Sequence, residues 1–133
     1  MEFNKENSVM ISVIMSVYNA EKYLDLAIKS ILNQSFRNFE FIIIEDCSTD
    51  NSLEILKNYA EKDSRIKIIQ KTENKRMKGF IENLNIGLKE AKGKYIARMD
   101  ADDISHPSRF EKQVAFLESH SDIFMVGSSI NFI

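Results

Sequence analysis

The most informative stretch of the sequence is Tyr95-Ile96-Ala97-Arg98-Met99-Asp100-Ala101-Asp102-Asp103. A short apolar run, typical of a buried strand, ends in three carboxylates within four residues. Carboxylates this close repel one another unless solvent or a cation relieves them. An acidic cluster at the end of a buried strand therefore indicates a divalent metal at the rim of a sheet, and hard oxygen ligands favour Mn²⁺ or Mg²⁺.

The acidic cluster has two interpretations on sequence alone. In an extended segment, residues two apart point the same way. Asp100 and Asp102 would then share one cation, or one would hold the cation while the other meets a ribose hydroxyl. The alternative is a solvated acidic turn before a helix that starts near Pro107. His106 is a third ligand or a residue of the helix start, and we favour the helix start; Arg98 would pair with Asp100 or Asp102 when no metal is bound.

Outward from this stretch, short apolar runs alternate with one-sided helical patterns. The expected strands are residues 9–17, 39–45, 65–70, 94–99, 123–126 and 129–133, and the expected helices are residues 21–33, one after Ser52, one marked by apolar residues from 80 to 91 and one with Pro107 in its first turn. Strands buried on both faces and joined by helices form a parallel sheet with right-handed crossovers. The fold class is therefore α/β with a mostly parallel sheet.

Polar residues cluster where three expected strands end, at residues 16–19, 45–48 and 100–103. Ligands of parallel sheets bind beyond these carboxyl ends. Asp46, next to Glu45, would accept hydrogen bonds from a base or a ribose, or would only build a turn and cap the next helix together with Asp50. Tyr18 would stack on a nucleobase, or would pack at the rim as an ordinary tyrosine.

Two other features have simple interpretations. The basic residues Lys71, Lys75, Arg76 and Lys78 would clamp a diphosphate or form a solvated loop, and we favour the solvated loop. Cys47 has no histidine near it in sequence, so we expect a small buried residue and not a nucleophile.

The composition excludes several classes of protein. The 133 residues carry a net charge of −2, which offers no basic field to nucleic acid. A single cysteine rules out an internal disulfide, and no apolar run approaches the roughly 20 residues of a membrane-spanning helix. We expect a flexible lead-in at residues 1–10 and one domain at residues 11–133, cut from a longer protein and located in the cytoplasm.

Sequence motifs for phosphate binding by glycine-rich loops are missing. There is no G-x-x-x-x-G-K-[ST] and no G-x-G-x-x-G. The G-x-S-x-G motif of a nucleophilic serine is also missing. A bound anion must therefore be held by a metal and by side chains.

Four ordered motifs together resemble the family 2 nucleotide-sugar glycosyltransferases, from Ile11 to about Ile133. They are residues 11–19 (ISVIMSVYN), 30–36 (SILNQSF), 45–52 (EDCSTDNS) and 93–103 (GKYIARMDADD). The resemblance implies the GT-A fold, a three-layer Rossmann-like arrangement that binds nucleotide sugars.

The resemblance also implies roles for individual residues. Ser16, Val17, Tyr18 and Asp46 would line the nucleoside pocket, most often for uridine, with Asp100 and Ala101 also contacting the nucleotide. Asp102 would be the main metal ligand, with Asp100 beside it. The donor would be a nucleotide-diphospho-sugar, probably UDP-linked, and the acceptor a glycan or lipid-linked hydroxyl used in cell-surface polysaccharide synthesis. The family's catalytic base would lie beyond residue 133, and the full protein would work at the inner face of the membrane; a homodimer is left open.

Three residues depart from the family's usual pattern. Ser16 stands where proline is common, Glu45 where aspartate is common, and Cys47 where glycine is common. Because glycine takes a left-handed backbone easily, Cys47 predicts a different turn after Asp46. Two other functions stay open: a non-catalytic nucleotide-binding module, and a phosphoacceptor signalling domain, which the acidic cluster after the fourth strand fits poorly.

Overall fold

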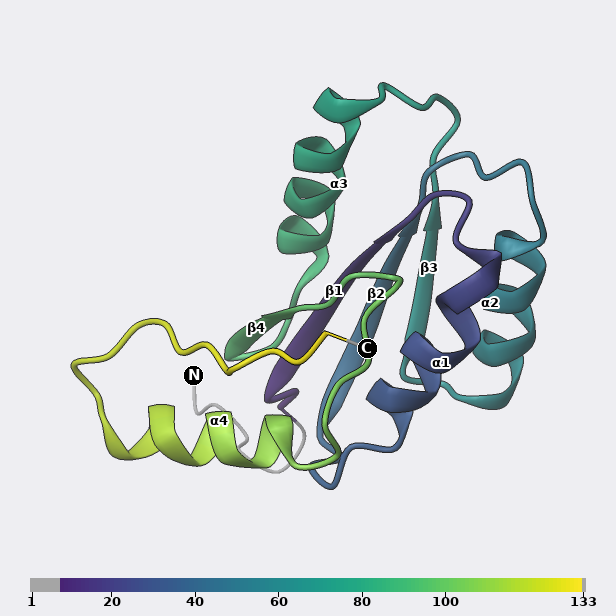
Figure 1. Ribbon diagram of the computed structural model, residues 1–133. Coiled ribbons are helices and arrows are strands. Elements are labelled where there is room, and N and C mark those ends of the chain that lie inside the picture. Colours follow the sequence, from purple (N-terminus) through teal and green to yellow (C-terminus); the bar gives the residue numbers. More distant parts are fainter. Residues whose placement is uncertain (1–7, 133) are drawn as a thin grey trace.

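A four-stranded, wholly parallel sheet forms the centre of the protein (Figure 1). The structure is a computed structural model that describes residues 8–132, so most of the expected lead-in lies outside the described residues. The sheet order is β3-β2-β1-β4, with β1 at Ile11–Val17, β2 at Phe39–Glu45, β3 at Ile66–Gln70 and β4 at Tyr95–Arg98. These four strands confirm the α/β class and the parallel sheet.

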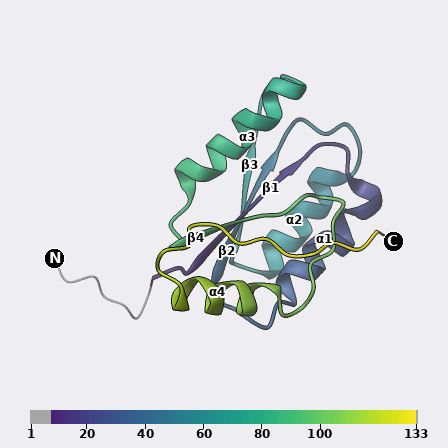
Figure 2. The same cartoon turned by 60° about the vertical axis from the view of Figure 1, so that its left-hand side comes forward.

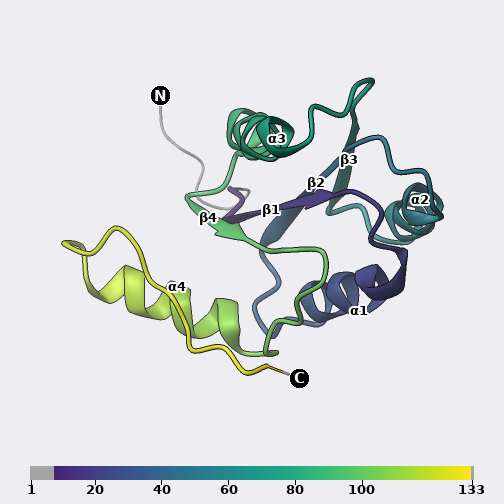
Figure 3. The ribbon, with the colours of Figure 1, turned by 45° about the horizontal axis from the view of Figure 1, so that its top comes forward.

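Helices cover both faces of the sheet and make three layers (Figure 3). The helices are α1 (Glu21–Leu32), α2 (Ser52–Lys62), α3 (Met77–Glu90) and α4 (Arg109–Ser119). α1, α2 and α4 pack on one face, and α3 covers the other face alone. Within α1, the expected apolar stripe is buried at Leu24, Ala27, Ile28 and Ile31. The fourth helix begins at Arg109, so Pro107 precedes it and does not lie in its first turn.

The register of the strands fixes where their polar ends meet. Val17 pairs with Glu45, and Glu45 pairs with Gln70, so β1, β2 and β3 end at one level. β4 pairs Arg98 with Ile14, three residues before β1 ends. The acidic residues after β4 therefore leave the sheet below the rim that the other three strands form.

α3 packs on the sheet through the partly buried Leu84 and Ile86, but its fully buried positions are small or polar, which the sequence interpretation did not foresee. The buried positions are Gly79, Asn83 and Gly87, four residues apart on one face. A Cβ atom at Gly87 would lie 2.5 Å from Ile14 Cγ2, so only glycine permits this close approach. Of the expected apolar marks, Ile81 is 65% exposed and Leu88 is 50% exposed. The spacing G-x-x-x-N-x-x-x-G was the available signal for this face.

The strands expected at 123–126 and 129–133 are wrong for every residue that the structure describes. Residues 121–132 form no strand, and Ile133 lies outside the described residues (Figure 2). A strand needs a neighbour for its N–H and C=O groups and a face to bury. Here Phe124 and Phe132 are 96% and 94% exposed, so these apolar side chains do not pack on a surface formed by residues 8–132. None of the helices within residues 8–132 has the length and apolar character of a membrane span.

Candidate functional site

Backbone hydrogen bonds continue beyond the strands and hold their polar ends together. The N–H of Asp46 donates to the carbonyl of Val17 (2.8 Å), and the N–H of Lys71 donates to the carbonyl of Glu45 (2.9 Å). The N–H of Met99 donates to the carbonyl of Ile14 (3.1 Å). The three segments that we expected at one edge therefore all leave the sheet at its carboxyl edge, although the acidic residues leave it lower than the other two segments.

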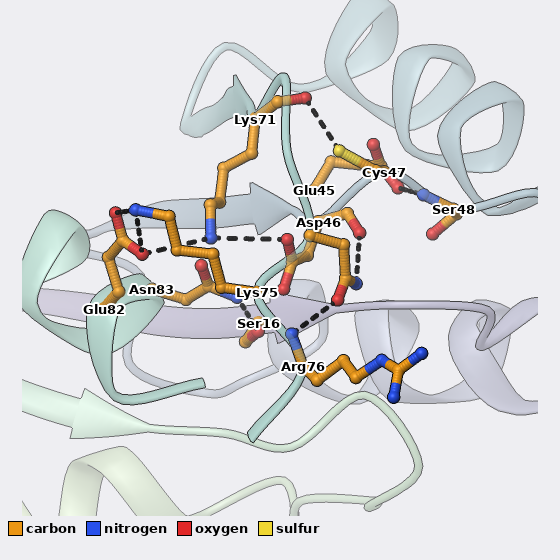
Figure 4. A network of polar contacts seen from close by, with 11 residues as sticks. Ser16, Glu45, Asp46, Cys47, Ser48, Lys71, Lys75, Arg76, Glu82 and Asn83 are labelled. Atoms are coloured by element: carbon orange, nitrogen blue, oxygen red, sulfur yellow. Dashed lines mark hydrogen bonds and ion pairs between the residues drawn. The ribbon is translucent and has the colours of Figure 1, made fainter. Parts of the chain in front are cut away.

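Asp46 lies in a buried polar network at this edge (Figure 4). Asn83 Nδ2, from α3, donates to Asp46 Oδ2 (2.9 Å) and to Ser16 Oγ (2.8 Å). Asp46 is 4% exposed and Asn83 is 1% exposed. Two of the predicted nucleoside residues, Ser16 and Asp46, are thus brought together by Asn83, a residue that the sequence interpretation missed.

Lys71 belongs to this network and not to a solvated loop. Its Nζ lies 3.4 Å from Asp46 Oδ1 and 3.7 Å from Glu82 Oε2, and its side chain is only 9% exposed. Lys75 is half exposed and pairs with the same Glu82 at 3.4 Å. The expectation of a solvated basic loop is therefore wrong for Lys71, because two carboxylates compensate its charge.

Three buried atoms of the network have no hydrogen-bond partner within residues 8–132. They are Asp46 Oδ1, Asn83 Oδ1 and Lys71 Nζ. Buried polar groups are normally hydrogen-bonded, so such atoms call for a ligand or a water. Asp46 Oδ1 and Lys71 Nζ still face each other as an ion pair at 3.4 Å, so their unmet hydrogen-bonding capacity at the predicted nucleoside pocket is partial.

The turn after Asp46 keeps the left-handed backbone in spite of its cysteine. Cys47 has a φ of 60°, and its Sγ donates to the carbonyl of Lys71 (3.2 Å). The expectation of a different turn is therefore wrong, and the residue is half-buried. Glu45 Oε1 accepts the N–H of Ser48 (2.7 Å). Glu45 therefore stabilises the turn, and the Asp46 carboxylate is not used for that hydrogen bond.

The loop after β1 is tied to the same turn. Asn19 Oδ1 accepts the N–H of Thr49 (2.7 Å), with Asn19 itself at a φ of 46°. Asp50 accepts the N–H groups of Ser52 (2.9 Å) and Glu21 (3.2 Å), which confirms its structural role. Tyr18 stands 53% exposed at the rim, open to a stacking partner.

The acidic residues after β4, Asp100 to Asp103, form a turn and not an extended segment, and we call them the acidic turn. The N–H of Asp103 donates to the carbonyl of Asp100 (3.2 Å). Carboxylate oxygens of Asp100, Asp102 and Asp103 all lie within 4.8 Å of one another. The turn therefore gathers three carboxylates where the extended interpretation aligned two.

The charges in this acidic turn are only partly compensated. Burial and the carboxylates of Asp100 and Asp102 raise the pKa of Asp103 above its ordinary value of 3.8. Arg98 Nε lies 3.5 Å from Asp100 Oδ1, which confirms the expected pair, although both side chains are about half exposed. His106 Nδ1 contacts Ser108 (3.0 Å to Oγ), as a residue of the helix start would, and lies outside the group of carboxylates.

The donor set of the acidic turn fits a divalent cation. Three carboxylates supply hard oxygen ligands, and a divalent charge would relieve the repulsion among them, which adds to burial in raising the pKa of Asp103. Mg²⁺ and Mn²⁺ both accept such ligands.

The fold and the polar carboxyl edge are those of a Rossmann-like α/β protein, and comparison with known proteins gives the family. Residues 12–132 match the family model described as glycosyl transferase family 2. The chain belongs to this family. Its fold is the GT-A fold: Staphylococcus aureus TarS 1-349 in complex with UDP superposes with a TM-score of 0.77 at 32% identity, over 84% of this chain and 33% of that one.

Two curated relatives are considerably longer than this chain. An uncharacterized glycosyltransferase of Haemophilus influenzae is 50% identical over 128 residues, which are 96% of this chain and 39% of the relative. The O-antigen biosynthesis glycosyltransferase WbnJ of Escherichia coli is 43% identical over 127 residues, 93% of this chain and 47% of the relative. The chain thus spans less than half the length of either relative.

Proposed function

We propose that this chain is the donor-binding part of an inverting glycosyltransferase that uses a nucleotide-diphospho-sugar, with UDP as the nucleotide. One observation carries the proposal. The carboxyl edge of the sheet sets the buried Asp46 network beside an acidic turn with three clustered carboxylates. The UDP complex of the S. aureus relative supports uridine as the base.

The roles follow from the chemistry of each side chain. Asp46, held by Asn83, would accept hydrogen bonds from the base, and the exposed ring of Tyr18 would stack on it. Ser16 and Val17 would complete the wall of the nucleoside pocket.

The acidic turn would serve the diphosphate. Asp100 and Ala101 would lie at the ribose, and Asp102, with Asp100, would hold the divalent cation. Mn²⁺ or Mg²⁺ in this place supplies a positive charge that stabilises the departing nucleotide diphosphate. The role of the chain would be to hold the carboxylates of the acidic turn where they can bind this cation beside the diphosphate.

The rest of the reaction belongs to the part of the relatives that this chain does not span. A carboxylate base that deprotonates the acceptor hydroxyl is expected beyond residue 133. We infer a glycan or lipid-linked acceptor in cell-surface polysaccharide synthesis, which the O-antigen relative supports. The full protein would act in the cytoplasm, at the inner face of the membrane.

Calorimetric titration with UDP tests the donor site. We expect binding that requires Mn²⁺ and that falls roughly ten-fold or more in Asp102→Asn, because one cation ligand loses its charge. Asp122→Asn, the same change at an exposed position, should bind like the wild type. UDP binding that does not depend on Mn²⁺, or a wild-type UDP affinity in Asp102→Asn, would contradict the proposed cation site.

A transfer assay on the full-length protein separates the enzyme from a non-catalytic module. Release of UDP from a UDP-sugar in the presence of acceptor glycans supports the enzyme. Tight UDP binding without any turnover of a panel of nucleotide sugars would favour the binding module.

A further inference from the structure

The motif at residues 30–36 has no part in the donor site as described, yet it contacts the chain just after the acidic turn. The N–H of Ser105 donates to Ser30 Oγ (3.0 Å). The N–H of Ser35 donates to the carbonyl of Pro107 (2.9 Å). The end of α1 therefore holds the segment that leads from the acidic turn to α4 (Figure 3).

Gln34 is the most buried part of this contact. It is 1% exposed, and its Nε2 donates to the carbonyl of His106 (2.7 Å) and to that of Ser30 (3.1 Å). Its Oε1 accepts the N–H of Phe110 (3.1 Å), one of the unpaired donors at the start of α4. One side chain thus fixes both the segment before α4 and the first turn of the helix.

Arg109 joins the two ends of the acidic turn. Its Nη2 donates to the carbonyl of Arg98, the last residue of β4 (3.1 Å), and its Nη1 donates to Ser105 Oγ (3.0 Å). A planar guanidinium can bridge two acceptors at a set separation, which an ammonium cannot. The distance across residues 98–105 is therefore held by Arg109.

The acidic turn has little internal support of its own. Within the described chain its backbone is closed by the one bond from Asp103 to Asp100, and its clustered carboxylates repel each other. The geometry of the carboxylates must then be set from outside, by the groups that hold residues 98 and 105.

We propose that Gln34 and Arg109 are positioning residues for the divalent-cation site, an inference that rests on the donor site proposed above. Neither touches the cation; each holds the ends of the acidic turn so that its carboxylates stay at the spacing one cation requires. Groups that orient metal ligands typically change metal affinity by about ten- to a hundred-fold when removed.

Mn²⁺ affinity in the presence of UDP tests the inference. Calorimetry and the electron paramagnetic resonance signal of free Mn²⁺ would be measured for the wild type, Gln34→Met and Arg109→Met, with unfolding midpoints alongside. We expect both variants to bind Mn²⁺ roughly ten-fold more weakly. Arg109→Lys should not restore the affinity, because it keeps the charge and loses the bridge.

Glu40→Gln is the matched control. It also disrupts a buried polar contact, the ion pair of Glu40 with Lys67, at the opposite edge of the sheet. We expect it to lose stability and to keep wild-type Mn²⁺ affinity. Ser30→Ala, which removes a single acceptor on a helix, is the milder variant if Gln34→Met does not fold, and its Mn²⁺ affinity should also fall.

The outcomes separate the two proposals. Folded variants that bind Mn²⁺ as the wild type does would overturn the positioning role and leave the donor site standing. A wild-type chain that binds UDP but not Mn²⁺ would overturn the cation site, and the positioning role with it.

Discussion

At the scale of the residue, Cys47 adopts an unfavourable backbone conformation in the turn that follows the buried Asp46. A non-glycine residue at a φ of 60° is disfavoured by about 1–2 kcal/mol, and a β-branched residue by more. We therefore expect Cys47→Val to unfold at lower urea concentration, with a free energy of unfolding about 2 kcal/mol below the wild type. Cys47→Gly should be at least as stable as the wild type, and a Val variant of unchanged stability would show that the turn is not left-handed in solution.

Asn83 gives a second prediction at this scale. Replacing it with alanine leaves Asp46 Oδ2 and Ser16 Oγ without their buried donor, which costs about 1–3 kcal/mol of stability. With Asp46 no longer held, we expect UDP affinity by calorimetry to fall about ten-fold. Asn85→Ala, two residues along the same helix and exposed, should change neither quantity. Equal UDP affinity in the two variants would contradict a role for Asn83.

The residues that sequence reasoning identified are those whose role depends on their own local setting. Asp46 follows a buried strand, and Asp50 precedes a helix, so chain order alone predicts their places. Asn83 owes its role to a strand that lies 67 residues away along the chain, at Ser16. No local pattern of apolar residues predicts such a contact. The spacing of the small residues in α3 was the sequence signal for it.

At the scale of the element, strands were predicted well where both faces are buried. Every residue of β2 is buried, so its apolar run has one explanation. Residues 123–132 carry the same apolar signal and form no strand in the described chain, because pairing depends on a neighbour and not on composition. For residues 100–103 the sequence left an extended segment and an acidic turn both open, because the spacing of two aspartates does not determine the backbone between them, and the structure shows the turn.

Glu40 links several elements at the amino edge of the sheet and gives a prediction in pH. Its carboxylate accepts Lys67 Nζ (2.6 Å), Ser12 Oγ (2.6 Å) and the N–H of Lys92 (2.7 Å). Burial alone would raise the pKa of Glu40, but these hydrogen bonds outweigh burial and hold it below the ordinary value of 4.5. The folded state then binds its proton less readily than the unfolded state does. The stabilisation is therefore full above about pH 4.5 and is lost as the pH falls through the lowered pKa.

Glu40→Gln should accordingly be less stable at neutral pH, by about 2 kcal/mol. The gap to the wild type should narrow as the pH falls below about 4.5, because the wild-type carboxylate also becomes neutral. Urea unfolding at neutral and acidic pH measures both gaps. A gap of constant size would mean that the charge of Glu40 contributes nothing to stability.

At the scale of the whole molecule, the topology places the proposed donor site and the main supporting ion pair at opposite edges of the sheet. The carboxyl edge gathers the Asp46 network and the acidic turn. Among residues 8–132, two of the three non-glycine residues with positive φ, Asn19 and Cys47, each lie two positions after a strand end at this edge. The amino edge holds Glu40 and its partners, which tie strands to one another. Parallel strands impose this division, since all of them deliver their carboxyl ends to one side.

This division predicts where ligand binding should be felt. Hydrogen–deuterium exchange, with UDP and Mn²⁺ against UDP and a chelator, should slow at residues 45–49, 71–79 and 99–105, because binding stabilises the folded state and restrains the segments that it contacts. The amino-edge turn at residues 91–94 should change least. In Asp102→Asn the protection at residues 99–105 should vanish, because that segment is restrained through the cation. Protection spread evenly over both edges, or confined to the amino edge, would mean that the donor binds elsewhere on the fold.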